Sequence, residues 1–206
     1  MTTPDYWQQA TSELAERDAV MRGLIERFRG LALASRGDAF STLARSIVGQ
    51  QISVKAAQSV WDRLSSRMME MTPARVSSAR RPTLRSCGLS GQKADYIRDL
   101  ARKFLDGTLD PSRWSALEDE VLIVELTKVK GIGRWTAEMC LMFHLVRPDV
   151  LPVADLGLQR AIRLHYNRGR TLSIARMQKI GAVWAPWRSV ATWYLWRSLD
   201  PIPVEY

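Results

Sequence analysis

The chain has 206 residues, of which 46% are hydrophobic and 25% are charged, which is the composition of a globular protein with a buried core. Its formal net charge of +9 favours a polyanionic partner. With only two cysteines and two histidines, the chain cannot bind a four-thiolate iron–sulfur cluster, and we expect no cofactor. Residues 1–7 lack the apolar core of a signal peptide, and no apolar run is long enough to span a membrane. We therefore expect a cytoplasmic protein without membrane contact.

Capping residues mark the starts of most predicted helices. Ser, Thr and Asp side chains accept hydrogen bonds from the first free amides of a helix, and apolar residues at helical spacing follow each candidate. The predicted caps are Thr3 (before Pro4), Asp18, Asp38, Ser53, Thr72 (before Pro73), Ser90, Ser115 (with Glu118 as a capping box), Asp155 and Ser173.

These patterns predict an all-α protein of about ten helices. No alternating strand pattern exceeds about four residues, and no linker divides the chain, so residues 1–206 form a single functional unit. So many short helices favour two helical lobes with a cleft between them. Both cysteines and three of the eight tryptophans are expected in the core, namely Cys87, Cys140, Trp7, Trp61 and Trp114.

Residues 117–146 predict two helices joined by a tight turn, Gly131-Ile132-Gly133. Glycine permits positive φ and leaves the backbone amides bare of Cβ, and the second helix begins there with its positive dipole end. The turn suits a phosphate, and the cations Lys128, Lys130 and Arg134 beside it support that interpretation. The alternative is an ordinary αα-hairpin with a glycine cap.

Asp155 follows Pro152 and precedes a predicted helix. A structural N-cap is one interpretation of this residue. The other is chemical, because an anion near a DNA-binding hairpin can stabilise the positive sugar left by a departing base, or polarise the attacking water. The two roles are compatible, and the sequence does not separate a general base from an electrostatic stabiliser.

Several motifs together resemble the helix-hairpin-helix/GPD superfamily of DNA glycosylases, most closely the 3-methyladenine DNA glycosylase II branch. These motifs are Gly131-Ile-Gly-Arg-Trp-Thr-Ala137, Leu151-Pro-Val-Ala-Asp155, Ile47-Val-Gly-Gln-Gln-Ile-Ser53, Gly91-Gln-Lys-Ala-Asp-Tyr96 and Trp184-Ala-Pro-Trp-Arg-Ser189. The resemblance implies a two-lobed helical fold, a flipped base in the interlobe cleft, and Asp155 as the catalytic carboxylate. We expect the N- and C-terminal segments to share one lobe, and we expect no extra N-terminal β domain.

The resemblance also implies a set of site residues. The base pocket would contain Trp135, Trp196 and Met139, where some relatives place a tyrosine. Gln51 or Ile52 would fill the gap left in the duplex. The DNA-binding residues would be Gln50, Gln51, Ile52, Ser53, Lys128, Lys130, Gly131, Gly133, Arg134 and Thr136. The backbone carbonyls of Thr127, Val129 and Ile132 would hold a monovalent cation, Na⁺ or K⁺.

The expected function is excision of alkylated bases of the 3-methyladenine type from duplex DNA by a monomeric enzyme. Lyases of the superfamily carry a lysine two residues past the second glycine, where this chain has Trp135, so no strand cleavage is expected. Two alternatives remain: a glycosylase of the same fold acting on uracil or an oxidised purine, and a non-catalytic DNA-binding protein.

Overall fold

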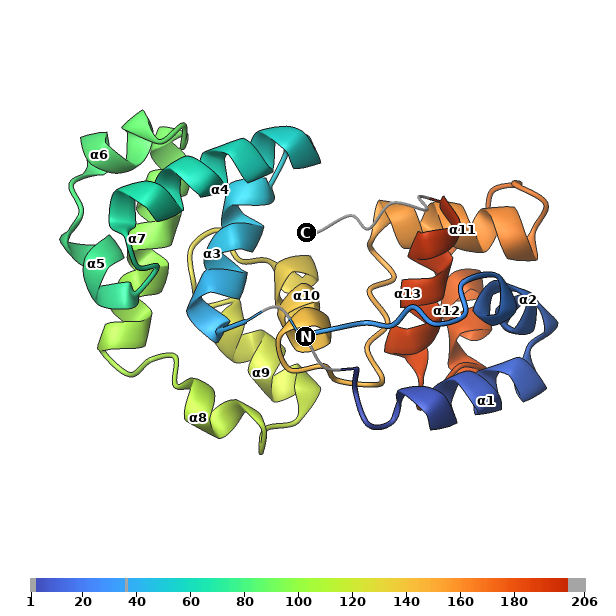
Figure 1. Cartoon of the computed structure of the whole chain (residues 1–206). Helices are drawn as coiled ribbons and strands as arrows, with labels where there is room; N and C mark the ends of the chain where they lie inside the picture. The colour runs from blue at the N-terminus through green and yellow to red at the C-terminus, as the bar shows by residue number, and fades with distance from the viewer. Residues whose placement is uncertain (1–2, 36, 200–206) are drawn as a thin grey trace. The chain divides into compact units, whose positions relative to one another are not determined.

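The computed structural model describes residues 3–35 and 37–199, and these residues contain helices and no strands (Figure 1), which confirms the all-α prediction. They form thirteen helices, more than the ten or so predicted, partly because short ones such as α8 gave weak signals. The helices are α1 (Trp7–Arg17), α2 (Ala19–Arg27), α3 (Ala39–Gly49), α4 (Val54–Met68), α5 (Pro73–Ser78), α6 (Arg81–Ser86), α7 (Gly91–Leu105), α8 (Pro111–Trp114), α9 (Asp119–Leu126), α10 (Arg134–Phe143), α11 (Leu156–Tyr166), α12 (Ile174–Ala182) and α13 (Arg188–Leu199).

The described chain divides into two compact units. The first comprises residues 3–35 and 141–199, and the second comprises residues 37–140. The N-terminal helices α1 and α2 therefore share a core with the C-terminal helices.

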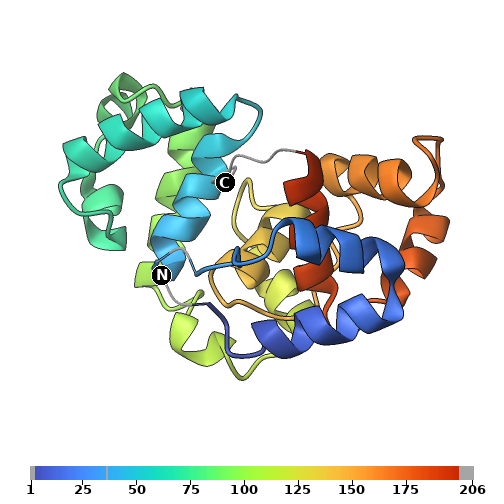
Figure 2. The same cartoon turned by 45° about the vertical axis from the view of Figure 1, so that its right-hand side comes forward.

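In the first unit, α1 and α2 pack on each other and on α13, which also packs against α11 (Figure 2). Trp7 meets Trp193 edge-on, with ring centroids 5.3 Å apart. Asp18 caps α2, and its Oδ2 accepts hydrogen bonds from the Tyr166 hydroxyl at 2.7 Å and from the Trp184 indole at 3.0 Å. One short N-terminal side chain thus joins helices from both ends of the chain.

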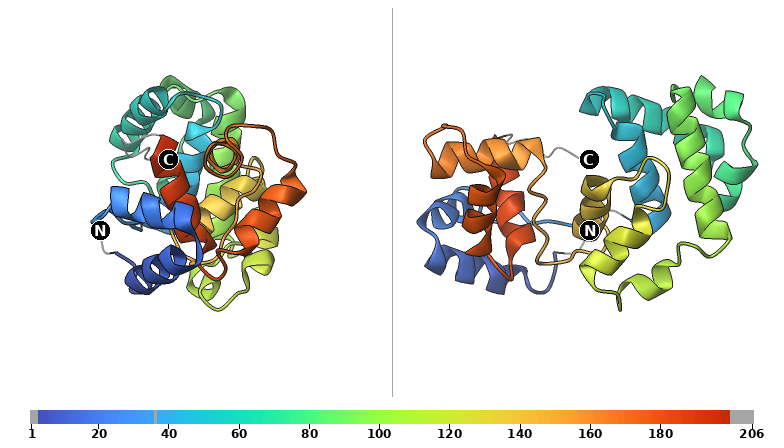
Figure 3. Two further views of the ribbon diagram at one scale, coloured as in Figure 1. Left: turned by 90° about the vertical axis from the view of Figure 1, so that its right-hand side faces the viewer. Right: turned by 180° about the vertical axis from the view of Figure 1, so that it is seen from behind.

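In the second unit, α3 packs against α4 and α7, and α7 also carries α5 and α6 (Figure 3). The predicted apolar stripe of α3 is buried and consists of Phe40, Leu43, Ala44, Ile47 and Val48. The predicted core residues Trp7 and Trp114 are buried as well, whereas Trp61 is only half-buried. Both cysteines are buried free thiols, as predicted.

Seven of the predicted caps are confirmed, each accepting a backbone N–H at the helix start: Asp18, Asp38, Ser53, Thr72, Ser90, Asp155 and Ser173. Two predictions were wrong. Helix α1 begins at Trp7, and Pro4 instead closes a turn by accepting the Trp7 amide at 2.9 Å. Ser115 has helical φ and ψ at the end of α8, so α9 begins after Glu118 and the capping box does not form.

Within residues 3–35 and 37–199, we find no helix with both the length and the hydropathy needed to span a bilayer.

Candidate active site

Asp155 lies at the N-terminus of α11, where its backbone is extended with φ −69° and ψ 123°. Its Oδ1 accepts the amide of Leu158 at 2.6 Å, so the carboxylate caps the helix as the sequence predicted. The positive end of the helix dipole favours a negative charge at this position. Asp155 is only half-buried, so the carboxylate is both ordered and within reach of solvent.

Trp196 of α13 holds the same carboxylate. Its indole Nε1–H donates to Asp155 Oδ1 at 2.8 Å. Gly157 makes room for this contact, because a Cβ there would lie 3.1 Å from Oδ1 and 3.4 Å from the indole nitrogen. The ring of Phe143 stacks on the indole with an interplanar angle of 15°. Trp196 therefore makes a polar contact with Asp155 that the sequence did not predict, and its role in stacking on a base stays a prediction.

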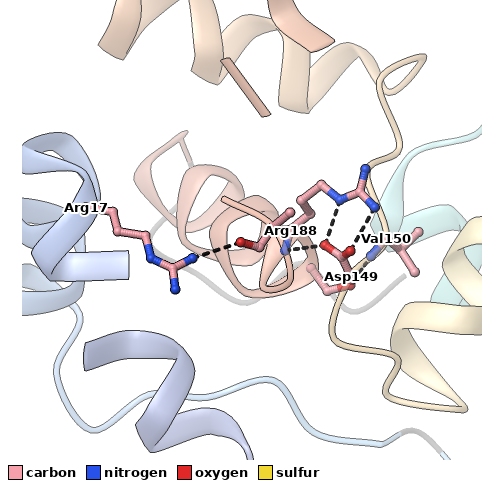
Figure 4. Close-up of polar contacts among 6 residues, drawn as sticks. Arg17, Asp149, Val150 and Arg188 are labelled. Atoms are coloured by element: carbon pink, nitrogen blue, oxygen red, sulfur yellow. Dashed lines mark hydrogen bonds and ion pairs between the residues drawn. The ribbon is translucent and has the colours of Figure 1, made fainter. Parts of the chain in front are cut away.

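The segment that leads to Asp155 is anchored to the start of α13. The Arg188 guanidinium pairs with both oxygens of Asp149, at 2.6 Å and 2.8 Å (Figure 4). The amide of Val150 donates to the Ser189 hydroxyl at 2.9 Å in a buried position. Because α13 also carries Trp196, one helix fixes both the path of the chain towards Asp155 and the orientation of its carboxylate.

In the second unit, α9 and α10 form the predicted hairpin. The amide of Ile132 donates to the Val129 carbonyl at 3.1 Å, and Gly131 has φ +84°, a conformation that favours glycine. The two glycines differ in their surroundings. A Cβ on Gly131 would lie 2.1 Å from the Tyr96 ring, whereas a Cβ on Gly133 would meet nothing within 4 Å. Gly131 is thus needed for the turn conformation and for packing against Tyr96, whereas Gly133 is the exposed glycine of the turn.

Of the hairpin cations, Lys128 and Lys130 are exposed, as a phosphate contact requires. Arg134 instead lies between two carboxylates, because it forms a bidentate ion pair with Glu120 and bonds to Glu138 at 3.0 Å. The hydrogen bonds with Glu120 raise the pKa of the guanidinium further above its usual value. A phosphate would have to compete with these carboxylates for Arg134.

The loop after α3 has two different sides. Gln50 turns inward, and its Nε2 donates to the Gly131 carbonyl at 2.8 Å, while Ser53 uses its hydroxyl to cap α4. Gln51 and Ile52 between them are exposed, and Gln51 has a left-handed backbone with φ +59°. Both candidate wedge residues are therefore accessible, and the choice between them stays open.

Besides Arg134, three predicted site residues lie on α10. Trp135 is half-buried in the first turn of the helix. Thr136 and Met139 are each 3% exposed, so the Thr136 hydroxyl is a poor candidate for a direct phosphate contact. These residues belong to the second unit, whereas Asp155 and Trp196 belong to the first.

The described residues contain no group of three or more His, Cys, Asp or Glu side chains arranged to bind a metal. Burial raises the pKa of the Cys140 thiol to about 12, which makes it a poor thiolate ligand.

Sequence reasoning missed the residues that contact Asp155, Trp196 or the segment before Asp155, namely Phe143, Asp149, Gly157 and Arg188. It also missed three residues of α7 that contact the loop after α3 or the hairpin turn, namely Lys93, Tyr96 and Asp99. The motif Gly91–Tyr96 contributed to the family resemblance, but no role was assigned to its side chains. Most of their contacts join residues far apart in the chain, so no local pattern indicated them.

Comparison with known proteins places this architecture in a family. The sequence profile of the HhH-GPD superfamily of base excision DNA repair proteins matches residues 44–186. DNA-3-methyladenine glycosylase 1 of Schizosaccharomyces pombe is 32% identical over 180 residues, which cover 85% of this chain and 78% of that protein. The chain therefore belongs to the HhH-GPD superfamily, as its motifs indicated.

Two solved structures are similar along almost the whole chain. The DNA-3-methyladenine glycosidase of Bacillus halodurans has a TM-score of 0.84 at 34% identity, over 96% of this chain and 92% of that one. The 3-methyladenine DNA glycosylase Mag1 of Schizosaccharomyces pombe, solved with abasic DNA, has a TM-score of 0.83 at 28% identity, over 96% and 99%.

Proposed function

We propose that this HhH-GPD protein is a monofunctional DNA glycosylase of base excision repair. It binds duplex DNA as a monomer, excises alkylated bases of the 3-methyladenine type, and leaves an intact strand with an abasic site. The similarity to 3-methyladenine glycosylases along most of the chain supports the activity. The observation that carries the proposal for this chain is the ordered, solvent-reachable carboxylate of Asp155 at the N-terminus of α11.

Asp155 supplies the charge that the reaction needs. As the glycosidic bond breaks, positive charge develops on the sugar, and a fixed carboxylate stabilises it or orients the attacking water. Alkylation at N3 or N7 already makes the purine a cationic leaving group. The reaction therefore needs no strong general acid, and a single carboxylate is sufficient in this mechanism.

Recognition of the base is assigned to aromatic and sulfur-containing side chains. An indole face attracts a cationic ring, and extruded bases are commonly held between aromatic side chains. Trp196, Trp135 and Met139 are the proposed pocket residues. Phe143 stacks on one face of the Trp196 indole, so a base would stack on the other face.

The DNA backbone is assigned to the hairpin. The exposed Lys128 and Lys130 and the open Gly133 offer charge and backbone to phosphates, which position the enzyme without reading the sequence. Gln51 or Ile52 fills the stack that the base has left.

The hairpin carbonyls are also the proposed ligands of a monovalent cation. The Val129 carbonyl accepts the amide of Ile132, and its second lone pair leaves capacity for an ion. The carbonyls of Thr127, Val129 and Ile132 would hold Na⁺ or K⁺, whose charge would add to the attraction for phosphate.

Changing Trp196 to Phe tests whether this tryptophan orients Asp155. The variant keeps an aromatic ring for stacking but loses the N–H that donates to Oδ1. We expect kcat to fall by about tenfold with KM nearly unchanged, since a charge-assisted hydrogen bond is worth roughly 1.5–3 kcal/mol.

Trp187→Phe is the matched control, because it removes an indole N–H that donates to Glu13 at 2.9 Å, away from Asp155. It should leave kcat unchanged. A Trp196→Phe enzyme with wild-type kcat would mean that Trp196 serves only in stacking.

A lesion panel tests the function itself. Duplexes carrying 3-methyladenine, 7-methylguanine, uracil or 8-oxoguanine are incubated with the protein, and released bases are quantified. We expect release from the alkylated duplexes only. Preferential release of uracil or of the oxidised purine would favour the same-fold alternative, and tight binding without release of any base would favour a non-catalytic DNA-binding protein.

A further inference from the structure

One face of α7 touches both loops that are assigned to DNA. Lys93, Tyr96 and Asp99 are three residues apart from one to the next, so they lie along one side of the helix. We call these three residues the α7 row. Lys93 contacts the loop after α3, and Tyr96 and Asp99 contact the hairpin turn.

Lys93 closes the C-terminus of α3. Its ammonium donates to the carbonyls of Val48 at 2.7 Å and Gln50 at 2.6 Å. A cation at this end of a helix is favoured by the free carbonyls and by the helix dipole. Partial burial lowers the pKa of Lys93, so its hydrogen bonds form where water competes less.

The two hydrogen bonds from Lys93 lie next to a residue with a strained backbone. Gln51 follows directly after the Gln50 carbonyl that Lys93 binds, and its φ of +59° is one that a residue with a Cβ rarely adopts. Such conformations persist where surrounding contacts enforce them, and they cluster at ligand clamps. The bonds from Lys93 fix the carbonyl orientation from which the exposed Gln51–Ile52 segment projects.

The same network reaches the hairpin. Gln50 donates from Nε2 to the Gly131 carbonyl at 2.8 Å, the Tyr96 ring covers the Cα of Gly131, and Asp99 Oδ2 accepts the amide of Lys130 at 3.0 Å. The Asp99 side chain is itself only 14% exposed. The two loops are thus joined to each other and to one helix.

We propose that the α7 row is a positioning element that holds the loop after α3, which contains Gln51, and the hairpin turn in one fixed arrangement. Lys93 is the residue of the row that fixes the loop after α3. The inference rests on the proposed function, which supplies the roles of the two loops. The Lys93 ammonium is bonded to protein carbonyls and does not contact phosphate in this proposal. Lys93 therefore affects extrusion of the base, whereas the hairpin lysines bind the phosphates.

The test is Lys93→Met, which keeps the length of the side chain and removes its donors. Emission of 2-aminopurine placed beside a non-hydrolysable abasic analogue reports insertion of the loop, and it does not depend on catalysis. We expect the emission change to be lost and kcat on alkylated duplex to fall by about tenfold, with KM altered by less than about threefold.

Lys103→Met is the matched control, because it removes the same charge from the last turn of the same helix, whereas Lys93 lies in its first turn. Both variants should bind undamaged duplex with equal affinity. Gln50→Ala is the second variant, and it should reproduce the loss of emission. The double variant should be no worse than Lys93→Met alone, because residues in one network give non-additive effects.

Two outcomes would overturn the inference. One is a Lys93→Met protein whose emission and kcat equal those of Lys103→Met. The other is a loss confined to affinity, equal for damaged and undamaged duplex, which would make Lys93 a phosphate contact. If Lys93→Met fails to fold, Gln50→Ala decides by the same readouts. If the wild-type protein inserts its loop but excises no base, the proposed function fails while the inference stands.

Discussion

Asp155→Asn is expected to slow excision of alkylated bases by about two orders of magnitude while leaving duplex affinity within about threefold. The loss of one preorganised electrostatic contact to the transition state typically costs about 3 kcal/mol. Asparagine is as good an N-cap as aspartate, and its carbonyl oxygen can still accept the hydrogen bonds that Leu158 and Trp196 now donate to Oδ1. The substitution therefore removes the charge and keeps the geometry.

Single-turnover excision and equilibrium binding to an abasic-analogue duplex measure the two parts of this prediction. Asp38→Asn is the control, because Asp38 caps α3 in the same way and lies in the other unit. It should be fully active. An Asp155→Asn enzyme that excised alkylated bases at nearly the wild-type rate would refute the assignment of Asp155 as the catalytic carboxylate.

Local features of the fold could be predicted because their causes are local. A cap needs a side-chain oxygen within three residues of a free amide, and Asp38, Ser90 and Ser173 each meet that condition. The stripe of α3 repeats at helical spacing and is buried. Asp155 combined both kinds of signal, since its cap is local and its motif is specific.

The contacts that refine the site could not be predicted in this way. Trp196 is 41 residues from the aspartate that it holds, and Lys93 is 43 residues from Gln50. Such pairs form only when tertiary packing brings two helices together, and neither residue type implies its partner. The left-handed backbone of Gln51 could not be predicted from the sequence either, because glutamine has no preference for positive φ.

The incorrect cap predictions have a physical cause as well. Ser115 and Glu118 have the spacing of a capping box, but Asp110 caps the short helix α8 immediately upstream. Ser115 is the C-terminal capping residue of that helix and has helical dihedrals, so it does not have the extended backbone of an N-cap. Two helix starts competed for one stretch, and the pattern alone did not show which would form.

The enzyme is expected to release the base without cutting the strand. A lyase forms a Schiff base between a protein amine and the sugar, after which the strand is cleaved. At the position where the lyases of this superfamily carry that lysine, this chain has Trp135, in the first turn of α10. Indole offers no nucleophilic amine. Lys128 and Lys130 precede the turn and are exposed, which suits phosphate contacts.

We therefore expect water to be the nucleophile, and incubation with alkylated duplex and borohydride should trap no covalent complex. Strand breaks should appear only after alkali, and the alkali-treated sample also proves that the base was removed. Efficient trapping by the wild-type protein would contradict the prediction. Lys130→Ala would then be the first variant to make, because the Lys130 amide is fixed by Asp99 and its side chain extends from the turn next to Gly131.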